Sequence, residues 1–202
     1  MFRSTVLMTF AAPAVVLAIA PAPLAGQHAA PEQLGQPTAV VVSGPEVGTE
    51  APDFLLSWAG RDGLGPIDRP FTLRAHRGKV VVLLFYPKDF TPTCTVEMAS
   101  FGDRYDELFG PGVVVAGINA DSLETHARFA ARLNLPFPLL TDPGQRVSRL
   151  YGSADRDGYN RRTVYVIGPD GKVAYRDVRF NPLDPRAYDE LRRAVQAARA
   201  GV

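Results

Sequence analysis

Two unbroken apolar runs organise the middle of the chain. The segments VVVLLFYP (80–87) and VVVAGINA (113–120) lack the alternation of polar and apolar residues that a half-exposed strand shows. Runs of this kind, rich in β-branched residues, are typical of central strands covered on both faces. The sequence therefore predicts two buried strands, and each is followed by a segment with helical spacing.

Apolar residues recur three and four positions apart in segments 92–109, 122–135 and 184–200, and we expect helices there. A shorter helix is expected over 144–152. The remaining domain segments are expected to be an extended piece at 51–56, a Gly-, Pro- and Asp-rich loop at 57–70, an extended piece at 71–76, a short strand at 137–142, a loop at 153–160 and a strand–turn–strand hairpin over 163–178.

The order of these elements indicates the fold class. A strand–helix–strand–helix–strand series is followed by a hairpin and a final helix, which is a βαβ unit followed by a ββα unit. This order predicts an α/β protein with a thioredoxin-like mixed β-sheet and helices on both faces.

The N-terminal segment has the pattern of a secretory signal peptide. Within residues 1–26 the only charge is Arg3, and an apolar stretch is followed by small residues and prolines. The alternative is a retained membrane anchor, although the apolar run is short for a span. We expect a signal peptide over 1–26, a linker over 27–46, a domain over 47–202 and export to a periplasm or the outside, with membrane contact only if the segment is uncleaved.

Composition excludes several function classes. With 22 basic and 21 acidic residues the chain has no charge excess that would indicate a nucleic-acid partner. A single cysteine excludes an intramolecular disulfide framework, a Cys-x-x-Cys redox pair and a multi-cysteine metal site. The three histidines have no ligand spacing, and no glycine-rich nucleotide-binding motif is present. We expect neither a metal nor a cofactor.

The chemistry converges on FYPKDFTPTCTVE (85–97). Thr91 and Pro92 are suited to the N-cap and the first position of the helix that follows the central strand, so Cys94 falls in its first turn. Free backbone N–H groups and the helix dipole favour a thiolate there. The alternative is that Cys94 is merely a small buried apolar residue. Because Thr91 stands where a dithiol motif has its first cysteine, exchange within the motif is excluded.

The spacing P-x-x-x-T-x-x-C resembles the active-site motif of the peroxiredoxins, the alkyl hydroperoxide reductase/thiol-specific antioxidant family. The wider segment is similar to the Q-type branch, the bacterioferritin comigratory proteins. The resemblance implies that Cys94 is the peroxidatic cysteine, that the Thr91 hydroxyl binds peroxide and that Pro87 shields the thiolate. It also implies that Arg162 is the active-site arginine and that Glu97 is the carboxylate that holds it.

The chain departs from the Q-type pattern at three positions. Ala99 stands where many members have a resolving cysteine, and Thr93 and Gly168 replace a frequent glycine and aspartate. The first departure predicts a one-cysteine cycle in which an external thiol, either a thioredoxin-like or glutaredoxin-like protein or a low-molecular-weight thiol, reduces the Cys94 sulfenic acid.

Other roles are left open by the sequence. The alternative function is an exported thioredoxin-like redox sensor or thiol–disulfide protein without peroxidase turnover. Tyr86 is equally suited to core packing and to the wall of the active site. His76 is expected in a turn and His126 on the solvent-facing side of its helix. The protein is expected to be a monomer or a homodimer.

Overall fold

The two apolar runs form neighbouring central strands. β5 (Val81–Phe85) and β6 (Val114–Asn119) pair in parallel, and every residue of β5 is buried. The computed structural model describes residues 43–155 and 157–201. The expected signal peptide, and the expected linker up to residue 42, lie outside the described residues.

These strands belong to a seven-stranded mixed sheet with the order β3-β2-β7-β6-β5-β8-β9. β7 is parallel to β6, whereas β8 is antiparallel to β5 and forms the expected hairpin with β9. The expected α/β fold with a mixed sheet is therefore confirmed. The other strands of this sheet are β2 (Trp58–Gly60), β3 (Gly63–Leu64), β7 (Leu139–Thr141), β8 (Thr163–Ile167) and β9 (Val173–Asp177).

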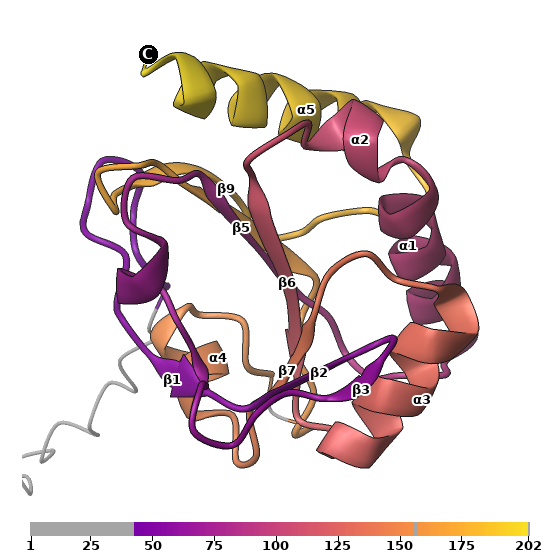
Figure 1. Ribbon diagram of the computed structural model, residues 1–202. Helices are drawn as coiled ribbons and strands as arrows, with labels where there is room; N and C mark the ends of the chain where they lie inside the picture. Colours follow the sequence, from indigo (N-terminus) through magenta and orange to yellow (C-terminus); the bar gives the residue numbers. More distant parts are fainter. Residues whose placement is uncertain (1–42, 156, 202) are drawn as a thin grey trace, which may run out of the picture. The chain divides into compact units, whose positions relative to one another are not determined.

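Two apolar clusters cover the two faces of the sheet. Val82 and Leu84 of β5 point into one cluster, and Leu83 and Phe85 point into the other, because successive strand residues face opposite sides. Figure 1 shows most helices on one side of the sheet. This side holds α1 (Pro92–Asp103), α2 (Tyr105–Leu108), α3 (Leu123–Leu133) and α5 (Pro185–Ala200).

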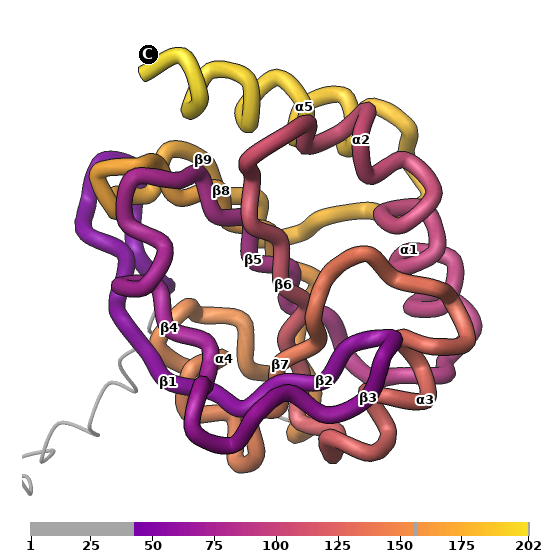
Figure 2. The backbone as a smooth tube through the Cα atoms, viewed as in Figure 1, coloured from indigo at the N-terminus to yellow at the C-terminus, as the bar shows by residue number. Residues whose placement is uncertain are grey.

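The opposite face carries smaller elements. α4 (Arg146–Leu150), the short 3₁₀ helix η1 (Arg74–His76) and a small second sheet pack there. In this sheet β1 (Leu55–Leu56) pairs with β4 (Phe71–Thr72), and Figure 2 shows the two segments side by side. Helices thus lie on both faces of the main sheet, as the element order predicts, but the layers are unequal.

The prediction of a loop over 57–70 was wrong. β2 and β3 form a hairpin there, and β2 extends the main sheet by pairing antiparallel with β7. The Trp58 indole N–H donates to the Arg69 carbonyl at 3.1 Å, which closes the hairpin's far end. Tertiary pairing at the sheet edge thus outweighs the turn-rich composition of the segment.

The prediction of one helix over 92–109 was also wrong, because the backbone leaves helical geometry at Arg104 (φ −105°, ψ 18°). The Arg104 side chain bonds Glu107 at 2.7 Å and lies 5.2 Å from the ring of Tyr188 on α5. These contacts accompany a change of direction that brings α2 onto α5. Similarly, the segment 71–76 is extended only at β4 and then forms η1.

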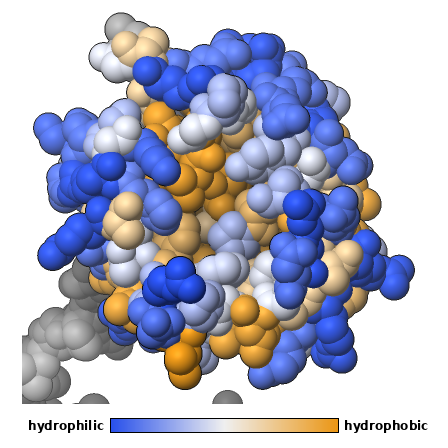
Figure 3. Space-filling model, viewed as in Figure 1, coloured by the Kyte–Doolittle hydropathy of each residue, from blue (hydrophilic) through white to orange (hydrophobic). Residues whose placement is uncertain are grey.

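The face of the molecule seen in Figure 3 is largely polar. Hydrophilic side chains surround a hollow near the centre of this view, and hydrophobic residues line the hollow. Among residues 43–155 and 157–201, no helix is both long and apolar enough to cross a membrane.

Candidate active site

The cysteine lies where the central strand leads into the first helix. β5 ends at Phe85, Thr91 is the N-cap of α1 with extended backbone, and Cys94 is the third residue of the helix. Its side chain is fully buried, in the same apolar cluster as Tyr86 and Met98. The first turn of a helix carries N–H groups without intrahelical acceptors, so this position favours negative charge on sulfur.

An arginine reaches the sulfur from the neighbouring strand. Arg162 immediately precedes β8, and Thr163 pairs with Phe85 at the end of β5, so the arginine arrives beside the start of α1. Its Nη2 donates to Cys94 Sγ at 3.4 Å, and its Nη1 donates to the Glu97 carboxylate. The guanidinium thus bridges Cys94 and Glu97.

The adjacent arginine points elsewhere. Arg161 donates from its guanidinium to the Gly152 carbonyl at 2.9 Å, and its backbone N–H donates to the Ser153 carbonyl at 2.7 Å. Neighbouring residues of an extended segment face opposite sides, which separates Arg161 from Arg162. Of the two arginines, only Arg162 contacts the thiol.

Electrostatics couple the members of this cluster. Burial raises the pKa of Glu97 to about 7, although the charge and hydrogen bond of Arg162 oppose that shift. Burial alone would lower the pKa of Arg162, but Glu97 and Cys94 outweigh it and raise the pKa above its ordinary value. The cation beside the sulfur is therefore permanent, whereas the carboxyl group changes its charge near neutral pH.

Thr91 and Pro87 belong to the loop above the helix start. The Thr91 hydroxyl donates to the Lys88 carbonyl at 3.2 Å and makes no side-chain cap to α1. Pro87 lies half-buried directly after Tyr86. The structure places both residues in the 86–91 segment next to the first turn of α1.

Tyr86 lies in the core and enters a polar network. It is fully buried, and its hydroxyl donates to the Asp89 carboxylate at 2.5 Å. Burial raises its pKa well above the ordinary value, and the charge of Asp89 adds to the shift. The same carboxylate contacts His126 Nδ1 at 2.8 Å, so the prediction that His126 faces solvent was wrong; its side chain is completely buried.

Sequence reasoning missed both Asp89 and His126. A signal for His126 was available, because it lies three residues before Phe129 and four before Ala130, on the helix stripe that is buried in the structure. No such signal was available for Asp89, since a single acidic residue in a loop is usually solvated.

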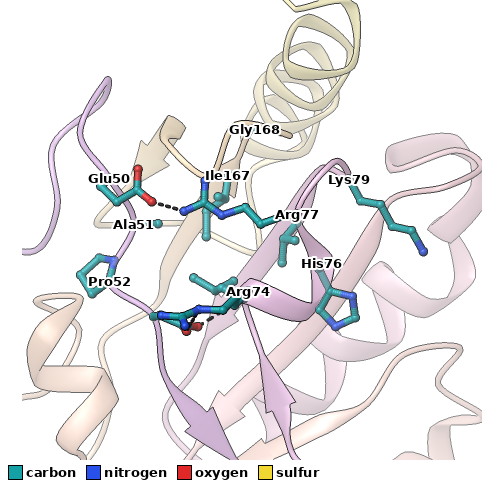
Figure 4. Close-up of a pocket in the computed structure, with 13 residues that line it drawn as sticks. Glu50, Ala51, Pro52, Arg74, His76, Arg77, Lys79, Ile167 and Gly168 are labelled. Carbon is teal, nitrogen blue, oxygen red and sulfur yellow. Dashed lines mark hydrogen bonds and ion pairs between the residues drawn. The ribbon is translucent and has the colours of Figure 1, made fainter.

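A separate pocket of about 260 Å³ lies at the other end of β5, near Val81 and the β8–β9 turn. Figure 4 shows its charged rim, in which Arg77 bonds Glu50, while Arg74 pairs with Asp53 at 3.4 Å. Because these cations are already paired within the rim, we assign this pocket no function. Among the described residues no cluster of His, Cys, Asp and Glu could hold a metal.

A thiol in the first turn of the helix that follows the central strand of a thioredoxin-like sheet, with an arginine at its sulfur, defines a cysteine-dependent redox protein. Comparison with known proteins gives the family. The model of the AhpC/TSA family matches residues 47–176, so the chain belongs to this family; it is a peroxiredoxin, a thiol-dependent peroxidase.

Individual relatives are also peroxiredoxins. The chain is 37% identical over 153 residues to the chloroplastic peroxiredoxin Q of Sedum lineare, a match that covers 74% of this chain and 77% of the relative. It is 35% identical over 166 residues to the peroxiredoxin Q of Triticum aestivum, covering 81% and 70%. The structure of the Xanthomonas campestris bacterioferritin comigratory protein superposes with a TM-score of 0.64 at 27% identity, covering 76% of this chain and 99% of that one.

Proposed function

We propose that this peroxidase reduces hydrogen peroxide and organic hydroperoxides by a one-cysteine cycle through a sulfenic acid on Cys94. The observation that carries the proposal is the Cys94 sulfur in the first turn of α1 with the Arg162 guanidinium at 3.4 Å. Cys94 is also the only cysteine of the chain, so no second thiol of the same chain can resolve the oxidised sulfur.

In the first step the Cys94 thiolate attacks the terminal oxygen of the hydroperoxide. An S–O bond forms and the O–O bond breaks, the sulfur is oxidised to a sulfenic acid, and the departing oxygen takes a proton to leave as water or an alcohol. Arg162 and the free N–H groups of the helix start stabilise the charge that develops on the oxygens. Thr91 would orient the peroxide, and Pro87 would shield the thiolate.

In the second step an external thiol condenses with the sulfenic acid, which releases water and leaves a mixed disulfide. A second thiol then cleaves the mixed disulfide and regenerates Cys94. Because the sulfur is fully buried, the first turn of α1 must open to admit a reductant.

Ionisation alone does not account for a fast peroxidase. Converting a few per cent of thiolate to almost complete ionisation gains about 30-fold, or ~2 kcal/mol. The remaining acceleration must come from donors fixed around the O–O bond. The contact between Arg162 and Cys94 supports this role for the guanidinium.

The test compares the wild type with Cys94→Ser, a nearly isosteric change. We expect the variant to fold but to lose peroxide reduction. One equivalent of peroxide without thiol should add one oxygen atom, about 16 Da, to the wild type. Turnover should then continue only when a thiol is added; arrest in the presence of several thiols would instead indicate a redox sensor, and a dominant Cys94–Cys94 dimer would indicate resolution between subunits.

A further inference from the structure

We propose that Asp89 and His126 form a positioning pair that fixes the 86–91 segment over the Cys94 helix start. The inference rests on the proposed function, since that segment carries Pro87 and Thr91. Among the described residues, the hydrogen bonds of Asp89 and His126 go to groups other than Cys94, so we assign them no part in the chemical step itself.

The Asp89 carboxylate is a buried junction of the molecule. It is 2% exposed, and it accepts hydrogen bonds from the Tyr86 hydroxyl at 2.5 Å and the Asn119 amide at 3.0 Å and contacts His126 Nδ1 at 2.8 Å. The three partners come from the loop itself, the end of β6 and α3. A buried carboxylate is stable only when it is surrounded by such donors, so the loop is tied to this one place.

The backbone beside the junction is tied as well. The Asp89 N–H donates to the Asp121 carboxylate at 2.7 Å, and the Asp121 N–H donates to Asn119 Oδ1 at 2.6 Å. These bonds connect the loop to the β6–α3 turn. The junction is therefore held through both its side chain and its main chain.

The next residue shows that the segment is under constraint. Phe90 has φ of +58°, a left-handed conformation that is unfavourable for a bulky residue and persists only where the surroundings impose it. Its ring lies 4.9 Å from the ring of Phe129 on α3. Because His126 and Phe129 are three residues apart on one helix face, α3 holds Asp89 and Phe90 by adjacent contacts.

Among the described residues, the His126 ring makes a hydrogen bond to Asp89 and to no other polar group. Its Nε2 is buried without a hydrogen-bond partner, so the Nδ1 contact with Asp89 is the polar contact of the ring. An apolar side chain would fill the same space without leaving a polar atom unpaired. The presence of an imidazole there is explained by the donor that it offers to Asp89.

The test uses two substitutions of His126 in the full-length protein. His126→Leu removes the donor to Asp89, whereas His126→Asn keeps one, because an asparagine amide can replace the Nδ1 donor. We expect His126→Leu to lower the second-order rate of hydrogen peroxide reduction at least tenfold and His126→Asn to be at least threefold faster than His126→Leu. Arg128→Gln, an exposed change on the same helix, is the control.

A second readout separates positioning from general damage. Alkylation of Cys94 by iodoacetamide does not need an oriented peroxide, so its rate in His126→Leu should not fall more than threefold below that of the wild type while peroxide reduction falls. A folded His126→Leu protein with wild-type peroxide reduction overturns the inference, and so does an equal loss of both rates. If His126→Leu does not fold, Tyr86→Phe decides the matter by removing another donor to Asp89 with the same two expected results.

Failure of the proposed function has a different outcome. In that case the wild type and Arg128→Gln would themselves fail to turn over peroxide with any added thiol. Wild-type turnover with unaffected His126 variants would overturn only the positioning pair.

Discussion

At the scale of single residues, one guanidinium contacts both a thiol and a carboxyl group whose charge changes near neutral pH. Arg162 donates to Cys94 Sγ and to the Glu97 carboxylate, and burial raises the pKa of Glu97 to about 7. Near neutral pH the carboxyl group of Glu97 is therefore partly protonated, and its attraction to the Arg162 guanidinium is weaker than that of a fully ionised carboxylate. Planar geometry allows Arg162 to serve both partners at once.

We predict that Arg162→Lys lowers the second-order rate of peroxide reduction at least tenfold, about 1.4 kcal/mol, because a lysine ammonium cannot bridge sulfur and carboxylate in one plane. Arg161→Lys is the matched control, since Arg161 bonds the Gly152 carbonyl instead. Stopped-flow measurement of peroxide consumption checks both. A damaging Arg161→Lys with a silent Arg162→Lys would contradict the assignment.

Glu97 also makes stability depend on pH. Its pKa is raised from 4.5 in a free chain to about 7 in the fold, so the native state holds a proton that the unfolded state has released. The free energy of unfolding should therefore fall as pH rises from about 4.5 to 7. Urea titrations across this range should show a shallower fall for Glu97→Gln than for the wild type; equal slopes would show that Glu97 is not responsible.

The same scale shows what sequence could predict of the site. The helix-start position of Cys94 followed from the Thr91–Pro92 pair, since capping preferences are local. The burial of Asp89 did not follow, because its three partners come from three separate parts of the fold. Only the assembled structure brings such donors together.

At the scale of elements, long buried strands were predictable and short edge strands were not. β5 and β6 are recognisable from their unbroken apolar runs, because such runs are typical of strands that are covered on both faces. β2 and β3 contain three and two residues, and their composition favours turns. β2 exists as a strand because it pairs with the edge of β7, and β3 pairs in turn with β2; both pairings depend on the sheet and not on the segment alone.

The turn between β8 and β9 depends on a glycine for two reasons. Gly171 has φ of +80°, and a Cβ there would overlap the Arg77 guanidinium, which is held by Glu50 and the Asp170 carbonyl. Gly144 has a similar φ of +73° but open space around it. An alanine at Gly144 therefore tests backbone strain alone, whereas an alanine at Gly171 tests backbone strain together with crowding by Arg77.

We predict that Gly144→Ala costs about 1 kcal/mol through its backbone alone. Gly171→Ala should cost roughly 1 kcal/mol more, because Arg77 must also leave its partners. For a domain of this size the difference corresponds to about 2–4 °C in Tm, which calorimetry resolves. Equal melting temperatures for the two variants would show that Arg77 moves aside freely.

At the scale of the whole molecule, the sheet separates two different regions. The Cys94 thiol lies past the carboxyl end of β5, and the charged pocket lies near Val81 at the beginning of this strand. The polar network around Asp89 is on the side of the thiol. Substitutions in the pocket rim are thus separated from the chemistry by the length of the central strand.

Export is a further prediction about the whole chain, drawn from the apolar segment led by Arg3. The mature protein recovered from the periplasm or medium should begin near residues 26 to 30. N-terminal sequencing of that material is the measurement. Full-length protein found only in the cytosol and still carrying Met1 would contradict the prediction.

The complete burial of Cys94 affects which oxidants can reach its sulfur. A peroxide is a small neutral molecule that can diffuse through transient gaps between side chains, whereas an oxidised protein or a bulky disulfide must touch the sulfur through an exposed surface that Cys94 lacks. Access to the sulfur therefore depends on the size of the oxidant. In the proposed cycle, the Cys94 thiol would then react with small peroxides while the first turn of α1 is closed, and exchange with bulky disulfides would have to wait until that turn opens.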